Sequence, residues 1–155
     1  MKKIFAYIVA ILLLSACTSD AASSTKPSQP ESDKGTVPMK LKIHVNDTTF
    51  TATLADNSPA TALKELLQKG DLTLDMEDFS NFEKVADLPT TLPRNDTQID
   101  TDAGDLILYL GKRIVIYYDK NSWNFTRLGK IDNVNKKRLK QILGDGNATV
   151  TFSVK

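Results

Sequence analysis

Residues 122–131, SWNFTRLGKI, bring two aromatic rings, one arginine and one lysine together in ten residues. Alternation along a strand would place Trp123, Phe125 and Arg127 on one face. If that face points outward, the rings and the guanidinium form a patch suited to a peptide or a glycan. If it points inward, the rings belong to the core, and Arg127 at the end of the strand reaches a carboxylate such as Glu83 or backbone carbonyls. Both interpretations stay open, and the candidate ligand-binding residues are Trp123, Arg127, Glu83 and Tyr118.

Catalytic chemistry has fewer candidates. Nucleophilic catalysis needs a nucleophile, a base and an orienting group, yet the chain has one cysteine, Cys17, and one histidine, His44. His44 falls on the polar face of a predicted strand. The carboxylates of Glu77 and Asp78 would point to opposite faces of a strand, and GDGN at 144–147 follows a predicted helix where a phosphate loop precedes one. We therefore predict no catalytic residue.

Four aspartates, at positions 96, 100, 102 and 105, suggest calcium as a possible ligand. An EF-hand loop starting at Asp100 would need an oxygen ligand at its fifth position and a glutamate at its twelfth. Those positions hold Gly104 and Gly111, so the EF-hand pattern fails. A looser calcium site and a solvated acidic turn both remain open, and we predict no metal and no cofactor.

The N-terminus carries the strongest signal in the sequence. MKK supplies positive charge and residues 4–14 are eleven consecutive apolar residues, which is the form of a secretory signal peptide over 1–16. Leu14, Ser15, Ala16 and Cys17 then resemble the lipobox of bacterial lipoproteins. That resemblance implies cleavage before Cys17 and attachment of diacylglycerol to its sulfur. The expected location is extracytoplasmic, in the cell envelope, with the protein anchored to a bacterial membrane by this lipid.

Composition divides the rest of the chain. Residues 17–38 comprise the lipidated cysteine and a stretch rich in Ser, Thr, Pro and Asp with little to bury, and they are expected to be a disordered tether. Residues 39–155 are expected to form one folded domain. The net charge is +1, and removal of Lys2 and Lys3 with a signal peptide makes it −1. A net charge this close to zero does not favour binding to nucleic acid. The expected oligomeric state is a monomer.

Hydrophobic periodicity predicts the elements of this domain. Residues 39–54 alternate apolar and polar side chains about Asn46 and Asp47, as a β-hairpin does. Helices are predicted after Ser58 and after Asp132, which are the expected caps, and residues 88–105 are predicted to be an ordered loop. Residues 106–118 are apolar almost throughout, which indicates strands covered on both faces or a barrel wall with a helix outside. About seven or eight strands and two helices favour a closed barrel.

Several segments together resemble a bacterial family with a cyclophilin-like fold: MKLKIHVNDTTFTATLADNSPAT, LTLDMEDF, LPTTLP, AGDLILY, IVIYY and SWNFTRLGKID. The resemblance covers residues 39–154 in order and implies a mainly β fold, a closed cyclophilin-like barrel of about eight strands with two short helices. Eukaryotic-type cyclophilins carry a Phe-His-Arg run whose arginine hydrogen-bonds the prolyl amide. None of the arginines of this chain follows Phe-His.

The sequence therefore predicts a membrane-anchored surface lipoprotein whose domain is a non-catalytic module that binds a peptide, a protein or a small ligand. The alternative is a divergent peptidyl-prolyl cis-trans isomerase that assists exported proteins. A protease-coupled assay with a proline peptide separates them, with Arg127→Ala as the variant that should abolish isomerisation. A structural role in an envelope complex is a third possibility.

Overall fold

The structure is a computed structural model that describes residues 37–154. The first β-hairpin lies at the start of this range. β1 (Lys40–Val45) buries every second side chain, and β2 (Thr48–Leu54) pairs with it antiparallel. Asn46, with a φ of 51°, begins the two-residue turn between them. The predicted hairpin is confirmed, and His44 is exposed on its polar face.

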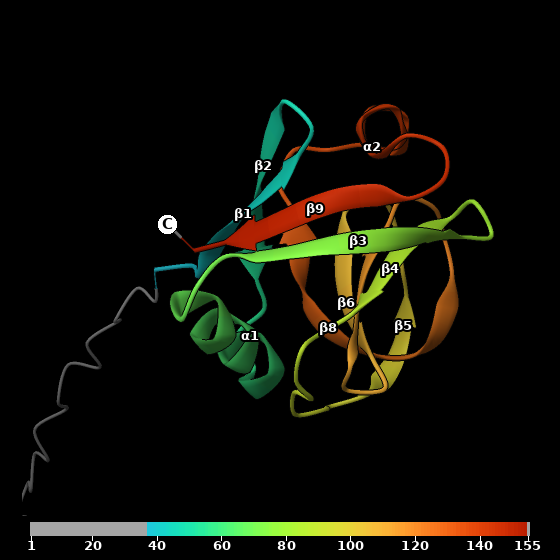
Figure 1. Ribbon diagram of the computed structural model, residues 1–155. Coiled ribbons are helices and arrows are strands. Elements are labelled where there is room, and N and C mark those ends of the chain that lie inside the picture. The colour runs from blue at the N-terminus through green and yellow to red at the C-terminus, as the bar shows by residue number, and fades with distance from the viewer. Residues whose placement is uncertain (1–36, 155) are drawn as a thin grey trace, which may run out of the picture. The chain divides into compact units, whose positions relative to one another are not determined.

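Eight strands close into an antiparallel barrel (Figure 1). The order around the ring is β2-β1-β9-β3-β4-β7-β6-β8, and pairing of β2 with β8 closes it. The remaining barrel strands are β3 (Leu72–Phe79), β4 (Glu83–Asp87), β6 (Asp105–Tyr109), β7 (Arg113–Tyr117), β8 (Ser122–Ile131) and β9 (Ala148–Ser153). The predicted barrel of about eight strands is therefore confirmed.

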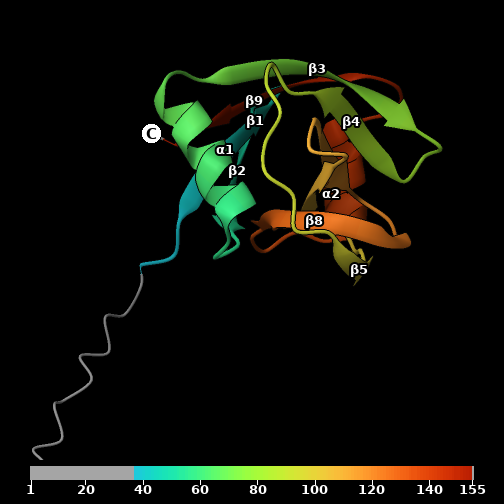
Figure 2. The same ribbon diagram turned by 90° about the horizontal axis from the view of Figure 1, so that it is seen from below.

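A ninth strand, β5 (Thr97–Asp100), lies outside the ring and pairs only with the first half of β8. The prediction of a loop over residues 88–105 was wrong for these four residues. Ile99, which lies opposite Trp123, is the only apolar side chain in β5. One apolar residue in four gives no alternation that a sequence pattern could reveal. In Figure 2 β5 lies beside β8.

The two helices lie on opposite sides of the barrel (Figures 1 and 2). They are α1 (Ser58–Gln68), which buries Leu63 and Leu67 in the core, and α2 (Lys136–Leu143), which buries Leu139 and Leu143 there. Both caps differ from the prediction. The side chains of Asn57 and Asn135 accept the N-terminal amide hydrogen bonds that were expected of Ser58 and Asp132.

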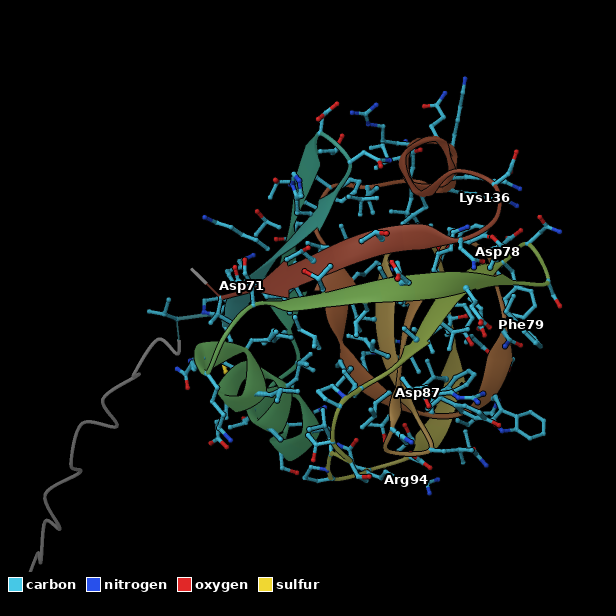
Figure 3. All side chains as sticks on the ribbon, viewed as in Figure 1. Asp71, Asp78, Phe79, Asp87, Arg94 and Lys136 are labelled. Carbon is cyan, nitrogen blue, oxygen red and sulfur yellow. The ribbon has the colours of Figure 1, made fainter. Side chains whose placement is uncertain are left out.

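One fully buried cation packs against the main core, over the ring of Tyr118. Lys84 of β4 is fully buried, and its Nζ donates to Asp78 Oδ2 at 2.6 Å, to the Gly144 carbonyl at 3.0 Å and to the Gly146 carbonyl. Asp78, at the end of β3, is labelled in Figure 3. Burial raises the pKa of its carboxyl, but hydrogen bonds from Lys84 and Tyr118 outweigh burial and hold the pKa below the ordinary 3.8. Lys84 thus connects the β3–β4 hairpin to the loop after α2.

The expected signal peptide (1–16), Cys17 and all but the last two residues of the expected tether (17–38) lie outside the described residues. Within residues 37–154, neither helix has the length and apolar character needed to cross a bilayer.

Candidate functional site

The outer face of the barrel wall carries a second apolar cluster. Along β7, Ile114 and Ile116 point into the main core, whereas Val115 and Tyr117 point outward. The outward side chains of neighbouring strands join them and surround a pocket of about 250 Å³. We call this the aromatic pocket; its lining residues are Phe79, Phe82, Glu83, Val85, Tyr109, Arg113, Val115, Tyr117, Asn121, Trp123 and Phe125.

Five of its rings form a continuous row. Phe79 meets Phe82 edge to face at 5.9 Å between centroids, and Phe82 stacks on Tyr117 at 6.1 Å. Tyr117 continues to Phe125 at 5.7 Å, and Phe125 meets Tyr109 edge to face at 6.1 Å. Rings in such mutual contact hold one another in place, so the pocket wall is preformed.

The mouth of the pocket exposes two large apolar side chains to solvent. Trp123 of β8 is 61% exposed and Phe79 at the end of β3 is 55% exposed. Phe79 is labelled in Figure 3 near the tip of the β3–β4 hairpin. Exposed aromatic side chains beside a preformed apolar cavity are typical of a surface that contacts a ligand.

Glu83 supplies an acidic group to the pocket. One of its carboxyl oxygens, Oε2, is buried and has no hydrogen-bond partner within residues 37–154. Burial raises the pKa of the Glu83 carboxyl above its ordinary 4.5, although a hydrogen bond with the Tyr117 hydroxyl lowers it in part. Asn121 Nδ2 donates to Tyr117 Oη at 3.2 Å and so orients this hydroxyl. Burial and the nearby carboxylate also raise the pKa of Tyr117.

Arg113 brings the only basic side chain of the lining. Its Nε donates to Asp87 Oδ1 at 3.1 Å, and both side chains are about half exposed. Asp87, at the end of β4, is labelled in Figure 3 and also lies 3.6 Å from Lys112 Nζ. The charge of Arg113 is therefore balanced by Asp87 and not by Glu83.

Of the four predicted ligand-binding residues, the structure brings two together. Trp123 and Glu83 both line the aromatic pocket. Arg127 does not: its Nη1 donates to Asp105 Oδ1 at 2.7 Å, where the sequence suggested Glu83 as a partner. Tyr118 lies in the main core with its hydroxyl bonded to Asp78 Oδ2 at 2.6 Å.

The other lining residues escaped sequence reasoning, although one signal for them existed. Residues 106–118 are apolar on both faces, and a helix outside the wall was one explanation for this. The structure instead places the second face against the aromatic pocket, because Ile107, Val115 and Tyr117 pack there. Phe79 and Phe82 reach it from the β3–β4 hairpin, a placement that depends on tertiary pairing.

No three side chains among His, Cys, Asp and Glu gather as a metal site anywhere in residues 37–154.

Residues 43–153, nearly all of the barrel, match the sequence model of the cyclophilin-like family. The chain belongs to the cyclophilin-like family. A solved structure with a similar fold is the solution structure of the hypothetical protein AF2241 from Archaeoglobus fulgidus. Its sequence is 13% identical, the TM-score is 0.55, and the likeness covers 77% of this chain and 96% of that one. No curated protein matches the sequence.

Residues 1–18 match the prokaryotic membrane lipoprotein lipid attachment site. This match includes Cys17, the predicted point of lipid attachment. The protein is therefore a lipid-anchored cyclophilin-like protein of the cell envelope.

Proposed function

We propose that this cyclophilin-like lipoprotein is a non-catalytic binding module that holds a short peptide segment or a small ligand in the aromatic pocket. The observation that carries the proposal is the pair of exposed side chains, Trp123 and Phe79, at the mouth of a preformed row of rings. Burying such exposed rings against a ligand removes a large apolar area from water, which stabilises the complex by about 25 cal/mol for each Å² buried. Two acyl chains or more would keep the module at the membrane surface.

The size of the pocket favours one side chain of a longer ligand. About 250 Å³ is below the roughly 300 to 1,000 Å³ typical of pockets that enclose a whole drug-sized molecule. A peptide would insert one residue there and lay its backbone across the exposed mouth. The proposal keeps the predicted division of the chain into a signal peptide (1–16), a lipidated cysteine with its tether (17–38) and a folded domain (39–155). It also keeps the predicted monomeric state.

Replacing Trp123 with alanine should weaken ligand binding by roughly 10-fold or more, because exposed aromatic anchors dominate small interfaces. The mature lipoprotein in phosphatidylcholine liposomes would be screened against an array of short peptides, and the hits titrated by calorimetry. Leu110→Ala is the matched control, since Leu110 is 56% exposed but lies outside the pocket lining. Equal affinity of the Trp123→Ala variant and the parent would place the binding site elsewhere.

Prolyl isomerisation is the second candidate, and the position of Arg113 favours it. A prolyl amide requires an arginine beside an apolar slot, and Arg113 lies in such a position. Its guanidinium is bound to Asp87, however, and is therefore not free to donate to a prolyl amide. For this reason we expect a protease-coupled assay with a proline peptide to give the uncatalysed rate. A faster rate that Arg113→Ala abolishes would establish the isomerase in place of the binding module.

A further inference from the structure

Glu83 differs from the other buried or half-buried carboxylates of the domain in having no cationic partner. Asp78 pairs with Lys84, Asp105 with Arg127 and Lys130, and Asp132 with Lys40. Among residues 37–154, no lysine or arginine nitrogen lies within ion-pair distance of Glu83. A half-buried carboxylate left without a cation carries a desolvation cost that a cationic ligand would offset.

Glu83 belongs to the lining of the pocket itself. Glu83 lies opposite Phe79 of β3 and opposite Tyr117 of β7 in the sheet register. Both of these residues line the pocket, as Glu83 does. Within residues 37–154, Glu83 Oε2 is buried without a hydrogen-bond partner. A cationic group that enters the pocket therefore meets a carboxyl group that no other cation occupies.

The rings around Glu83 are suited to positive charge. The face of an aromatic ring attracts a cation, and tryptophan attracts it most strongly. Phe82 stacks on Tyr117 beside the carboxyl group, and Trp123 stands at the mouth. Arg113, the one basic residue of the lining, is held by Asp87 and leaves the charge of Glu83 uncompensated.

We propose that the aromatic pocket recognises an organic cation, of the class to which lysine and arginine side chains belong, through the Glu83 carboxyl group and the surrounding rings. This inference rests on the proposed binding function and specifies its ligand. The aliphatic stem of such a side chain packs between the rings while its terminal N–H groups donate to the Glu83 carboxyl group. A neutral apolar side chain of the same length would fill the pocket but leave this carboxyl group without a cation.

The test uses Trp123 as its reporter, because it is the only tryptophan of the chain and lines the pocket. The mature lipoprotein in phosphatidylcholine liposomes is titrated with three blocked amino acids, N-acetyl-lysine, N-acetyl-arginine and N-acetyl-norleucine methylamides. Norleucine matches the lysine stem without its ammonium group. Tighter binding of the lysine or arginine probe by roughly 10-fold or more is expected, the size of a charge-assisted hydrogen bond.

Glu83→Gln removes the charge and preserves the shape of the side chain. It should weaken the lysine probe by roughly 10- to 100-fold and leave the norleucine probe unchanged. Thermal unfolding checks that this variant is folded: its midpoint at neutral pH should rise, because the desolvated charge is gone. Glu77→Gln is the matched control, since Glu77 is exposed on the neighbouring strand and does not line the pocket.

Equal affinity for the lysine and norleucine probes, or a lysine affinity that Glu83→Gln leaves intact, would overturn the cation inference. In either case the proposed binding function would stand, because Trp123 would still report a bound side chain. If peptides from the array bind but no blocked cation changes the Trp123 signal, the cation inference fails alone. If no probe and no peptide binds, the proposed function fails as well.

Discussion

Replacement of Lys84 with alanine is expected to lower the free energy of unfolding by about 3 to 5 kcal/mol, the cost of breaking a buried ion pair. The side chain is fully buried, so its removal leaves Asp78 without its cation and the Gly144 carbonyl without its donor. It also separates the β3–β4 hairpin from the loop that follows α2. Urea unfolding followed by circular dichroism measures the loss, and Lys84→Met gives a second variant that keeps most of the volume.

Lys112→Ala is the matched control for this change. Lys112 Nζ lies 3.6 Å from Asp87, and its side chain is 57% exposed, so its removal should cost less than about 1 kcal/mol. A Lys84→Ala variant that unfolds at the urea concentration of the Lys112→Ala variant would show that the buried pair adds nothing to stability.

Acid titration separates the ion pair from simple loss of packing. The pKa of Asp78 in the folded protein lies below its ordinary 3.8, so the contribution of the pair is complete above that value. It is lost as the pH falls through the folded pKa. The difference in unfolding free energy between the parent and Lys84→Ala should therefore shrink in acid below pH 3.8. A difference that is constant with pH would point to packing alone.

Replacement of Gly129 with alanine is expected to destabilise the barrel by roughly 3 kcal/mol, at the upper end of overpacking costs. Gly129 of β8 lies opposite Leu54 of β2, at the seam that closes the ring. A Cβ there would overlap the Thr53 carbonyl oxygen and lie 3.0 Å from Leu54 Cα. Both obstacles are backbone atoms, so the seam must widen, and thermal unfolding should show a lower midpoint.

Gly70→Ala is the control, because within residues 37–154 no atom beyond its chain neighbours lies within 4 Å of the position that its Cβ would take. Its unfolding free energy should stay within about 0.5 kcal/mol of the parent. If Gly129→Ala behaves like Gly70→Ala, the β2–β8 seam tolerates a side chain and does not limit closure of the barrel.

The elements with regular alternation could be predicted from the sequence. The hairpin over residues 39–54 and the barrel follow from apolar side chains that recur every second residue. β5 could not be predicted, because Ile99 alone gives no period. The helix caps were displaced by one residue at Asn57 and by three at Asn135, since several polar residues in each segment have the chemistry of a cap.

The candidate site was predicted only in part, for a similar reason. The cluster of residues in SWNFTRLGKI indicated Trp123, and the structure places that side chain at the pocket mouth. The partner of Arg127 could not be predicted, because Asp105 reaches it through pairing of β6 with β8, which has a bulge at Leu106 and Ile107. A bulge changes which side chains meet, and no local pattern reports it.

The alternation along β7 has a consequence for how this barrel could diversify. Ile114 and Ile116 serve the interior, while Val115 and Tyr117, their immediate neighbours, serve the aromatic pocket. Substitutions at the outward positions would change which ligand group fits without removing an atom from the main core. Proteins with this same barrel could therefore acquire new binding preferences without altering the main core, at a packing cost confined to the second cluster, where Val115 and Tyr117 are only 2% exposed.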